Sequence, residues 1–193
     1  VIVRVRFAEH NERHVMLAMP DGVKLATDVY RPARNGAPIP TRVPAIVERT
    51  PYNKDGVNAA MIEFFVKRGY AFVAQDVRGR FRSEGRWRPL RDDGRDGAAL
   101  LEWIGRQPWS SGKVGTVGTS YGGGTQHALA LAGAPHLAAM VPVDAMTNYG
   151  RYGIRHNGAF ELRWFNWVWT LGNATGTRAT ATGLTQSPNG KFA

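Results

Sequence analysis

The amino-acid sequence predicts an α/β fold: a mostly parallel sheet with helices on both faces and an antiparallel hairpin at its N-terminal edge. Two observations lead to this prediction. From residue 45 onward, short apolar runs alternate with segments of helical periodicity, an order typical of parallel sheets with crossover helices. Before residue 31, alternating apolar residues flank a turn signal, which indicates a hairpin. The 193 residues contain no cysteine, so disulfides contribute nothing to the fold.

The predicted strands are runs in which apolar residues alternate or follow one another without a break. They cover residues 1–7, 15–19, 23–30, 45–47, 70–74, 114–117 and 137–143. The turn signal Pro20-Asp21-Gly22 joins the second and third of them into a hairpin. Residues 31–44 contain four prolines, and we expect a surface loop there.

Three segments have helical periodicity and suitable ends. Residues 58–68 carry an apolar face and end before Gly69, a residue typical of helix C-caps. Residues 93–106 place acidic residues early and Arg106 late, as the helix dipole favours. Residues 121–132, rich in small side chains, form the third predicted helix. Beyond residue 148 this alternation of strands and helices ends, and an aromatic stretch leads into a polar tail.

The composition limits the classes of partner. Lys and Arg number 25 against 15 Asp and Glu, a formal net charge of +10. The densest basic group, residues 78–95, is interrupted by Glu84, Asp92 and Asp93. This pattern favours a solvated basic surface, so we expect no nucleic-acid partner. The absence of cysteine excludes thiolate zinc sites, iron–sulfur clusters and a cysteine nucleophile.

The sequence contains no membrane-spanning signal. No stretch of about 18 apolar residues occurs, so we expect no transmembrane helix and no membrane partner. The first residues lack the long apolar core and the small-residue cleavage site of a signal peptide. Together these two features favour a cytoplasmic location.

The motif Gly118-Thr119-Ser120-Tyr121-Gly122 fits the nucleophile-elbow pattern G-x-S-x-G. In this pattern the serine lies on a sharp strand-to-helix turn, and the glycines let neighbouring chain pass close to it. The helix that follows directs its free N–H groups at the point where an oxyanion forms. A predicted strand precedes the motif and a predicted helix follows it. A phosphate-binding turn is the alternative, but the order G-x-x-x-x-G-K-[ST] is missing. We therefore predict that Ser120 is a nucleophile.

A nucleophile elbow needs a second oxyanion donor, which comes from the loop after the third core strand. Here that loop includes Tyr52, whose phenolic O–H is the candidate donor, and Pro51, which stiffens the approach. A surface tyrosine in an ordinary turn is the alternative interpretation of Tyr52.

Five blocks of sequence, taken together, resemble the X-prolyl dipeptidyl-peptidase and cocaine-esterase family of serine hydrolases. They occur in the order found in that family, at residues 21–32, 48–52, 75–85, 107–115 and 118–123. The resemblance implies an α/β-hydrolase core, a helical cap and a β-rich C-terminal domain. It also implies Ser120 as nucleophile, with Tyr52 and the backbone N–H of Tyr121 forming the oxyanion hole. Small-molecule esters, amides or peptides, including X-Pro dipeptides, are the implied substrates, cleaved through an acyl-serine intermediate.

Measured against this family, the chain divides into three parts. Residues 1–148 correspond to an α/β-hydrolase core truncated before its last strands. Residues 149–172 correspond to the start of the helical cap, and residues 173–193 to a polar tail or a truncated cap.

A serine nucleophile also needs a histidine base and an acid. His127 lies on a helix that leads away from the elbow, and we place His136 at the opposite edge of the sheet. Asp144 and His156 are the in-chain candidates that remain, whereas the family places its acid and base past the cap. We therefore expect a fragment or truncated product that is inactive alone and exposes an unpaired strand at residues 137–143.

Three further groups of residues have alternative interpretations. Aromatic residues beyond position 160 either wall an acyl pocket or form the buried face of a helix: Trp164, Phe165, Trp167 and Trp169. A catalytically inactive basic binding module is the alternative to an enzyme, and it would use Arg78, Arg80, Arg82, Arg86, Arg88 and Arg91. The helix dipole explains the acidic residues at 92, 93 and 96 better than a metal site does, so no cofactor or metal is expected.

Overall fold

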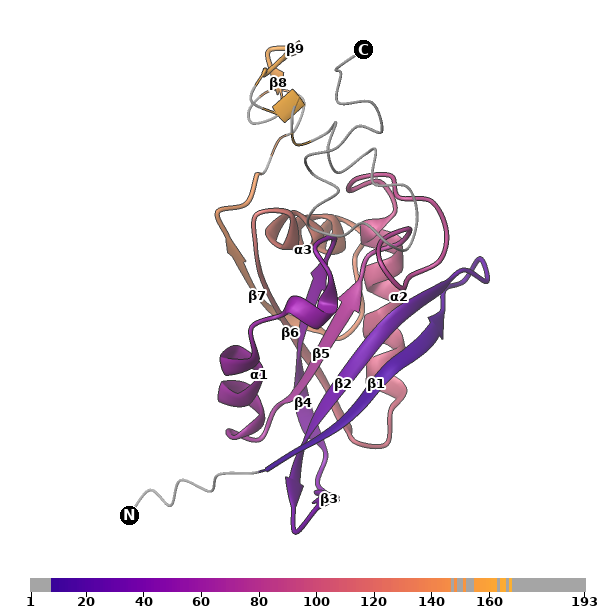
Figure 1. Ribbon diagram of the computed structural model, residues 1–193, viewed down its shortest axis with the longest axis vertical. Coiled ribbons are helices and arrows are strands. Elements are labelled where there is room, and N and C mark those ends of the chain that lie inside the picture. The colour runs from indigo at the N-terminus through magenta and orange to yellow at the C-terminus, as the bar shows by residue number, and fades with distance from the viewer. Residues whose placement is uncertain are drawn as a thin grey trace, which may run out of the picture.

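The computed structural model describes residues 8–146, 148, 151, 155–162, 164, 165 and 167. Its centre is a seven-stranded sheet in the order β1-β2-β5-β4-β6-β7, with β3 paired to β2 (Figure 1). The strands of this sheet are β1 (Ala8–Ala18), β2 (Lys24–Arg34), β3 (Ala37–Pro38), β4 (Val43–Thr50), β5 (Ala71–Asp76), β6 (Ser110–Thr119) and β7 (Leu137–Val143). The helices are η1 (Lys54–Gly56), α1 (Ala59–Val66), α2 (Asp93–Arg106) and α3 (Tyr121–Leu131). Separately, β8 (Arg155–His156) and β9 (Ala159–Phe160) form a two-stranded hairpin.

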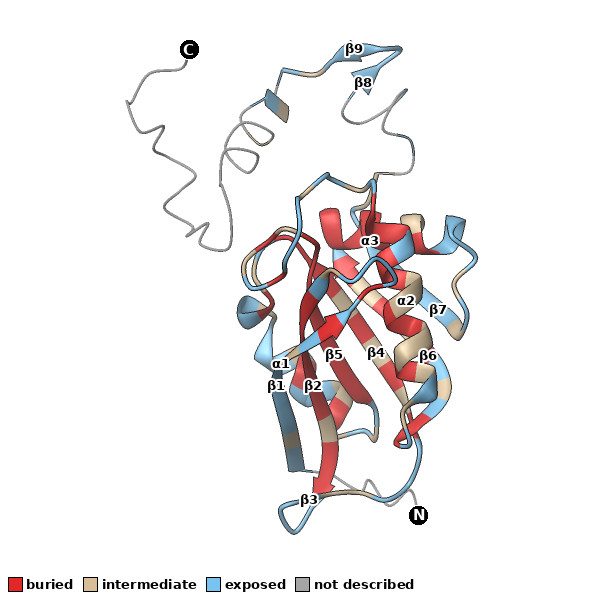
Figure 2. Ribbon diagram, turned by 90° about the vertical axis from the view of Figure 1, so that its right-hand side faces the viewer, coloured by how far each residue is buried: buried red, intermediate tan, exposed pale blue. Residues whose placement is uncertain are grey.

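Helices cover both faces of the sheet, as predicted. Because side chains alternate between the faces of a strand, neighbouring residues of β5 enter different cores. Val73 belongs to the core beneath α2 and α3, together with Leu100 and Leu129. Phe72 belongs to the second core, where Ile62 of α1 packs. Figure 2 shows the central strands as the most continuously buried part of the molecule.

The order of the strands reverses at β4. The parallel neighbours of β4 are β5 on one side and β6 on the other, and β2 joins β5 in the antiparallel direction. The carboxyl ends of β4, β5 and β6 therefore meet at one edge of the sheet. In open α/β sheets, ligands bind at such a reversal.

The predicted N-terminal hairpin is confirmed, but its first strand is longer than predicted. β1 starts at Ala8 and pairs antiparallel with β2, with an irregular register between Glu12 and Val15. Most of β1 is exposed, so its polar half has no apolar alternation that would reveal a strand. The strand predicted at residues 1–7 lies outside the described residues.

The prediction of a surface loop at residues 31–44 is partly wrong. β2 continues to Arg34, and β3 pairs with it across Asn35 and Gly36, which have φ of 52° and 79°. Asn-Gly is the pair that a hairpin turn with two positive φ angles favours, and this signal outweighed the prolines. Pro38 is tolerated because it lies in a two-residue edge strand.

The other predicted elements agree with the structure to within a few residues. α2 and β7 have the predicted bounds, and α1 begins after Asn58, whose side chain caps the Ala60 N–H. No helix in the described part of the chain is long and apolar enough to cross a membrane.

Candidate active site

Ser120 lies between the last residue of β6 and the first of α3. Its φ of 57° and ψ of −115° form a combination that a residue with a Cβ rarely adopts. The Ser120 N–H donates to the Val143 carbonyl at 2.9 Å, and the Ser120 carbonyl accepts from Gly123 and Gly124 at 3.0 Å. Neighbouring backbone thus holds this half-buried residue in its strained conformation. The strand-to-helix turn is where the motif places it, and its role as a nucleophile stays a prediction.

The close packing around the elbow involves Gly118 and Gly123. A Cβ on Gly118, whose φ is 151°, would lie 2.9 Å from the Gly122 carbonyl group. A Cβ on Gly123 would lie 2.4 Å from the Ala145 Cβ. Gly122 has more room, since its nearest neighbour, the Arg49 carbonyl oxygen, would be 3.5 Å away. The residue that ends the motif is therefore less constrained than the glycine after it.

Tyr52 follows β4 and lies at the same edge of the sheet as the elbow. Its ring meets the Tyr121 ring edge-on, with centroids 6.5 Å apart, and the side chain is 43% exposed. The contact between the end of β4 and Gly122 places the two segments against each other. The fold thus brings together all three residues of the predicted nucleophile and oxyanion hole.

The side chain of Tyr121 is buried, and its hydroxyl hydrogen-bonds to other residues. Its hydroxyl donates to Asp93 Oδ2 at 2.7 Å and accepts from the Leu90 N–H at 2.9 Å and Trp87 Nε1 at 3.1 Å. Burial, with the Asp93 carboxylate beside it, raises the pKa of the Tyr121 phenol far above its usual value. The backbone N–H belongs to the first turn of α3, where amides have no acceptor within the helix. This N–H is the group of Tyr121 suited to an oxyanion.

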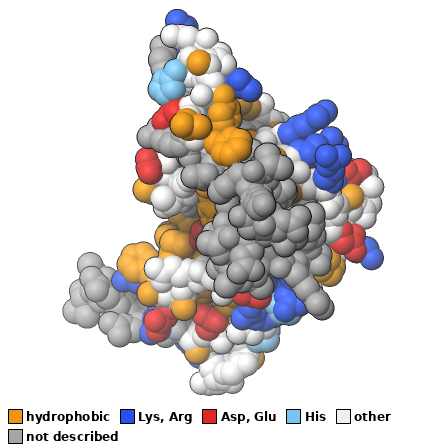
Figure 3. Space-filling view, turned by 45° about the horizontal axis from the view of Figure 1, so that its top comes forward, with side chains coloured by type: hydrophobic (Ala, Val, Ile, Leu, Met, Phe, Trp, Pro, Cys, Tyr) orange, Lys and Arg blue, Asp and Glu red, His pale blue; other side chains and the backbone are white. Residues whose placement is uncertain are grey.

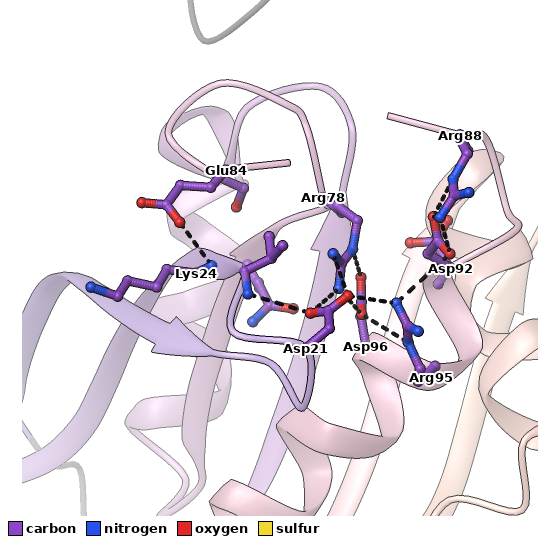
Figure 4. Close-up of polar contacts among 12 residues, drawn as sticks. Asp21, Lys24, Arg78, Glu84, Arg88, Asp92, Arg95 and Asp96 are labelled. Atoms are coloured by element: carbon purple, nitrogen blue, oxygen red, sulfur yellow. Dashed lines mark hydrogen bonds and ion pairs between the residues drawn. The ribbon is translucent and has the colours of Figure 1, made fainter. Parts of the chain in front are cut away.

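The acidic residues at the start of α2 pair with arginines. Asp92 binds Arg88 at 2.8 Å, and Asp96 binds Arg78 at 2.7 Å. Figure 4 shows Arg78 between Asp96 and Asp21, the latter in the turn between β1 and β2. The two ion pairs of Arg78 tie α2 to the hairpin and go beyond the helix-dipole explanation. Sequence reasoning missed these two pairs because the partners of Arg78 lie 18 and 57 residues away in the chain.

Asp93 lies deeper, beneath the elbow. It is 4% exposed and pairs with Arg49 at 3.4 Å. Burial raises the pKa of Asp93 above its usual value, although the Arg49 charge opposes this. Through Asp93, the start of α2 is bonded both to Tyr121 of α3 and to Arg49 of β4.

The predicted basic cluster does not form one free surface. Arg78 and Arg80 are 7% and 1% exposed. Arg80 donates to the Pro51 carbonyl at 3.0 Å and lies over the Trp87 ring. On the face drawn in Figure 3, Lys and Arg form separate groups. These observations do not favour the basic binding module.

The histidines after Ser120 bind other partners. His127 Nδ1 is 3.1 Å from the Met146 carbonyl, and His136 Nδ1 is 3.0 Å from the Gly112 carbonyl near the start of β6, the opposite edge. His156 pairs with Glu161 at 2.9 Å, and no hydrogen bond joins it to Asp144. All five histidines are among the described residues, and none of them hydrogen-bonds to Ser120.

Aromatic rings gather beside the elbow. The Trp167 ring stacks on Tyr121 with centroids 6.2 Å apart and contacts Trp87 at 6.0 Å. Trp164 contacts Trp167, whereas Phe165 is 43% exposed. Trp169 and the expected tail at residues 173–193 lie outside the described residues, as does half of the expected cap.

One group of side chains has the composition of a metal site. His14, Asp28 and Asp55 place ligand atoms within 4.8 Å of one another. The Lys54 ammonium, however, lies 2.9 Å from an acceptor atom of each. The lysine ammonium therefore supplies the positive charge that a metal ion would bring to this group.

Comparison with known proteins gives consistent results. Residues 21–189 match the model of the X-Pro dipeptidyl-peptidase family designated S15. The chain is similar to a cocaine esterase of Rhodococcus sp. (strain MB1 Bresler), 43% identical over 143 residues, which cover 72% of this chain and 24% of the esterase. It is also similar to the crystal structure of a CocE/NonD family hydrolase from Staphylococcus aureus, with a TM-score of 0.73 at 26% identity, covering 83% of this chain and 32% of that one. An α-amino acid ester hydrolase has a TM-score of 0.73 at 28% identity, over 91% of this chain and 32% of its own. The chain thus spans about a quarter to a third of the length of these relatives.

Proposed function

Because the chain belongs to the X-Pro dipeptidyl-peptidase (S15) family, we propose that it forms the nucleophile and oxyanion hole of a serine hydrolase. The observation that carries this proposal is the strained backbone of Ser120 at the β6–α3 turn, next to the loop of Tyr52. Such a turn presents a hydroxyl at the edge of the sheet where substrates bind.

The proposed reaction is acyl transfer to serine. The Ser120 hydroxyl oxygen attacks the carbonyl carbon of an ester or amide, and a base takes its proton. The carbonyl oxygen becomes an oxyanion, which accepts hydrogen bonds from the Tyr52 phenol and the Tyr121 N–H. The tetrahedral intermediate expels the alcohol or amine, which receives the proton. Water then hydrolyses the acyl-serine and regenerates Ser120.

We further propose that the base and its acid partner come from residues outside this chain. Two observations support this. Every histidine after Ser120 has another hydrogen-bond partner, and the similar proteins are three to four times longer than the part matched. The 193 residues alone would then have an assembled oxyanion hole and an unactivated serine.

Small esters are the substrate class that the similarities favour, with amides and X-Pro peptides as the further candidates. The cocaine esterase and the α-amino acid ester hydrolase are both named for ester substrates. The rings of Trp87, Tyr121 and Trp167 offer an apolar surface beside Ser120 that suits an acyl group.

A fluorophosphonate probe tests the nucleophile in the complete protein. We expect the probe to modify Ser120, located by peptide mass spectrometry, and Ser120→Ala to abolish labelling. The same substitution should lower turnover by about 10⁶-fold, as in other serine triads. Ser111→Ala, at an exposed residue of β6, is the matched control. Labelling that persists in Ser120→Ala would refute the proposed nucleophile.

The 193-residue chain tested alone addresses the missing base. If the base lies elsewhere, this chain should be folded by circular dichroism yet react with the probe far more slowly than the complete protein. Equal labelling rates would show that the base is present within these residues.

A further inference from the structure

Tyr52 has few contacts of its own that hold it in place. Its side chain is nearly half exposed, and its recorded ring contact is the edge-on approach to Tyr121. Within the described residues its phenol makes no hydrogen bond, so the oxygen is available for a ligand. The position of this oxygen therefore depends on the backbone of the loop that carries Tyr52.

That loop is anchored on both sides of Tyr52. Before it, the Pro51 carbonyl accepts from Arg80 Nε at 3.0 Å. After it, the Lys54 N–H donates to Asp76 Oδ1 at 2.7 Å. Between the anchors, Asn53 has a φ of 88°, which a residue with a side chain rarely adopts. Residues hold such a conformation only where their surroundings enforce it.

A third anchor of the loop is the Lys54 side chain. It is fully buried, and its ammonium lies 2.9 Å from Asp28 Oδ1, 2.9 Å from Asp55 Oδ1 and 2.9 Å from His14 Nδ1. An ammonium group has three N–H donors, and each one has an acceptor here when the His14 ring carries its proton on Nε2. These three groups around the ammonium, called the Lys54 cage below, therefore determine where the Lys54 Nζ lies.

Two of the three partners of Lys54, His14 and Asp28, come from the N-terminal hairpin. Asp28 is a fully buried residue of β2. His14 belongs to the irregular part of β1, with a φ of 58°, and its backbone N–H donates to Asp28 Oδ1 at 2.7 Å. The β1 irregularity thus turns both the backbone and the ring of His14 toward the buried pair. Because a buried charge that loses its partner is strongly destabilising, the loop cannot slide away from the hairpin.

We propose that Lys54 is a positioning residue for the reaction: it fixes the Tyr52 hydroxyl over Ser120 by locking the loop to the hairpin. This inference rests on the proposed function, since it gives Tyr52 the role of oxyanion donor. Lys54 itself contacts no substrate and acts through Tyr52.

The test is a double-mutant cycle on ester hydrolysis by the complete protein. Lys54→Met alone leaves two carboxylates, Asp28 and Asp55, with Arg13 as their charged partner. The variant to use is therefore Lys54→Met with Asp28→Asn, which removes one charge of each sign. A donor displaced by about 1 Å loses on the order of 10²-fold. We expect kcat to fall about 10- to 100-fold with KM changed less than about 3-fold, because oxyanion contacts act in the transition state.

The decisive comparison repeats this pair of substitutions in the Tyr52→Phe background. If Lys54 acts through Tyr52, the further loss there should be less than about 3-fold, since the donor is already absent. Lys67→Met, at the half-exposed lysine that is the C-cap of α1, should change neither constant. Thermal unfolding of every variant verifies that the fold persists.

A milder variant covers the case in which the double substitution prevents folding. His14→Ala removes one acceptor at a partly exposed position, and we expect a several-fold fall in kcat that again disappears in the Tyr52→Phe background. Equal losses with and without the Tyr52 hydroxyl, or an unchanged kcat, would overturn the proposal. If Tyr52→Phe alone leaves kcat unchanged, the role of Lys54 falls with that of Tyr52, while probe labelling of Ser120 still decides the nucleophile.

Discussion

At the scale of single residues, two tyrosines beside Ser120 present opposite groups to the candidate site. Tyr52 is 43% exposed, whereas the Tyr121 hydroxyl is buried against Asp93. If both contribute to an oxyanion hole, Tyr52 does so through its hydroxyl and Tyr121 through its backbone N–H. Removing the Tyr52 hydroxyl should therefore affect the reaction, and removing the Tyr121 hydroxyl should affect stability.

Replacing each tyrosine with phenylalanine should give crossed effects. Tyr52→Phe removes a proposed oxyanion donor and should lower kcat about 10²- to 10³-fold, with the free energy of unfolding unchanged. Tyr121→Phe keeps the backbone N–H, so kcat should stay within a few-fold. It loses a hydrogen bond to a buried carboxylate, which should lower the free energy of unfolding by about 1.5–3 kcal/mol.

Steady-state kinetics and urea denaturation of the two variants measure these effects. The wild-type protein and Tyr70→Phe, a change at an exposed tyrosine outside the candidate site, are the references. A large fall in kcat for Tyr121→Phe with stability intact would mean that its phenol takes part in the reaction.

At the scale of elements, the end of β5 carries a carboxyl group that responds to pH. Asp76 accepts from the Lys54 N–H at 2.7 Å and from the Arg82 N–H at 3.5 Å. Burial raises the pKa of Asp76 to about 6 despite these hydrogen bonds. The pKa of an aspartate in the unfolded chain is about 3.9. Between about pH 4 and pH 6, folded Asp76 therefore binds a proton that the unfolded chain has released.

This shift has a definite sign in the stability of the protein. The contribution of Asp76 is fully present below about pH 4 and is lost as pH rises through about 6, a change of about 3 kcal/mol. Asp76→Asn removes the titration and keeps an acceptor for Lys54. We expect the free energy of unfolding of wild type, relative to Asp76→Asn, to fall across this window and to be flat above pH 7.

Urea denaturation at several pH values measures that difference. Asp21→Asn provides a contrast, because hydrogen bonding to Arg78 lowers the pKa of Asp21 and its contribution is lost as pH falls instead. A wild-type to Asp76→Asn difference that is constant with pH would contradict the assignment.

The elements also show which features a sequence can reveal. α2 and β7 were predicted with their bounds because their periodicity, charge order and flanking residues are local signals. Ser120 and Tyr52 were named as candidates through motifs confined to a few consecutive residues, and their roles stay predictions. The Lys54 cage was missed because its acceptors come from three segments, β1, β2 and η1, and a lysine in a loop carries no signal of burial. The polar half of β1 was missed for a related reason, since its edge position imposes no apolar pattern.

At the scale of the whole molecule, β7 ends the sheet among the described residues, with β6 as its only strand partner there. Val141 and Val143 are 55% and 48% exposed, and β7 is visibly exposed in Figure 2. A strand of this kind is a template for pairing with another chain.

We expect the 193-residue chain, expressed alone, to self-associate through β7. Val141→Lys should reduce this association because a charge on an edge strand opposes pairing. Leu131→Lys, at the end of α3 where the side chain is 90% exposed, should reduce it less, although it adds the same charge. Sedimentation velocity measures the distribution of species. Equal effects of the two substitutions would indicate association through general surface hydrophobicity.

The central place of β4 and β6 has a consequence for how activity is lost on heating. The loop of Tyr52 follows β4 and the turn of Ser120 follows β6, and these two strands are neighbours in the middle of the sheet. The hydrogen bonds between β4 and β6 therefore set the distance between the loop and the turn. Fraying of β1 or β7 leaves β4 and β6 paired, but it removes His14 from Lys54 and the Val143 carbonyl from the Ser120 N–H. Inactivation by heat should therefore begin when these edge strands loosen, before the core melts cooperatively.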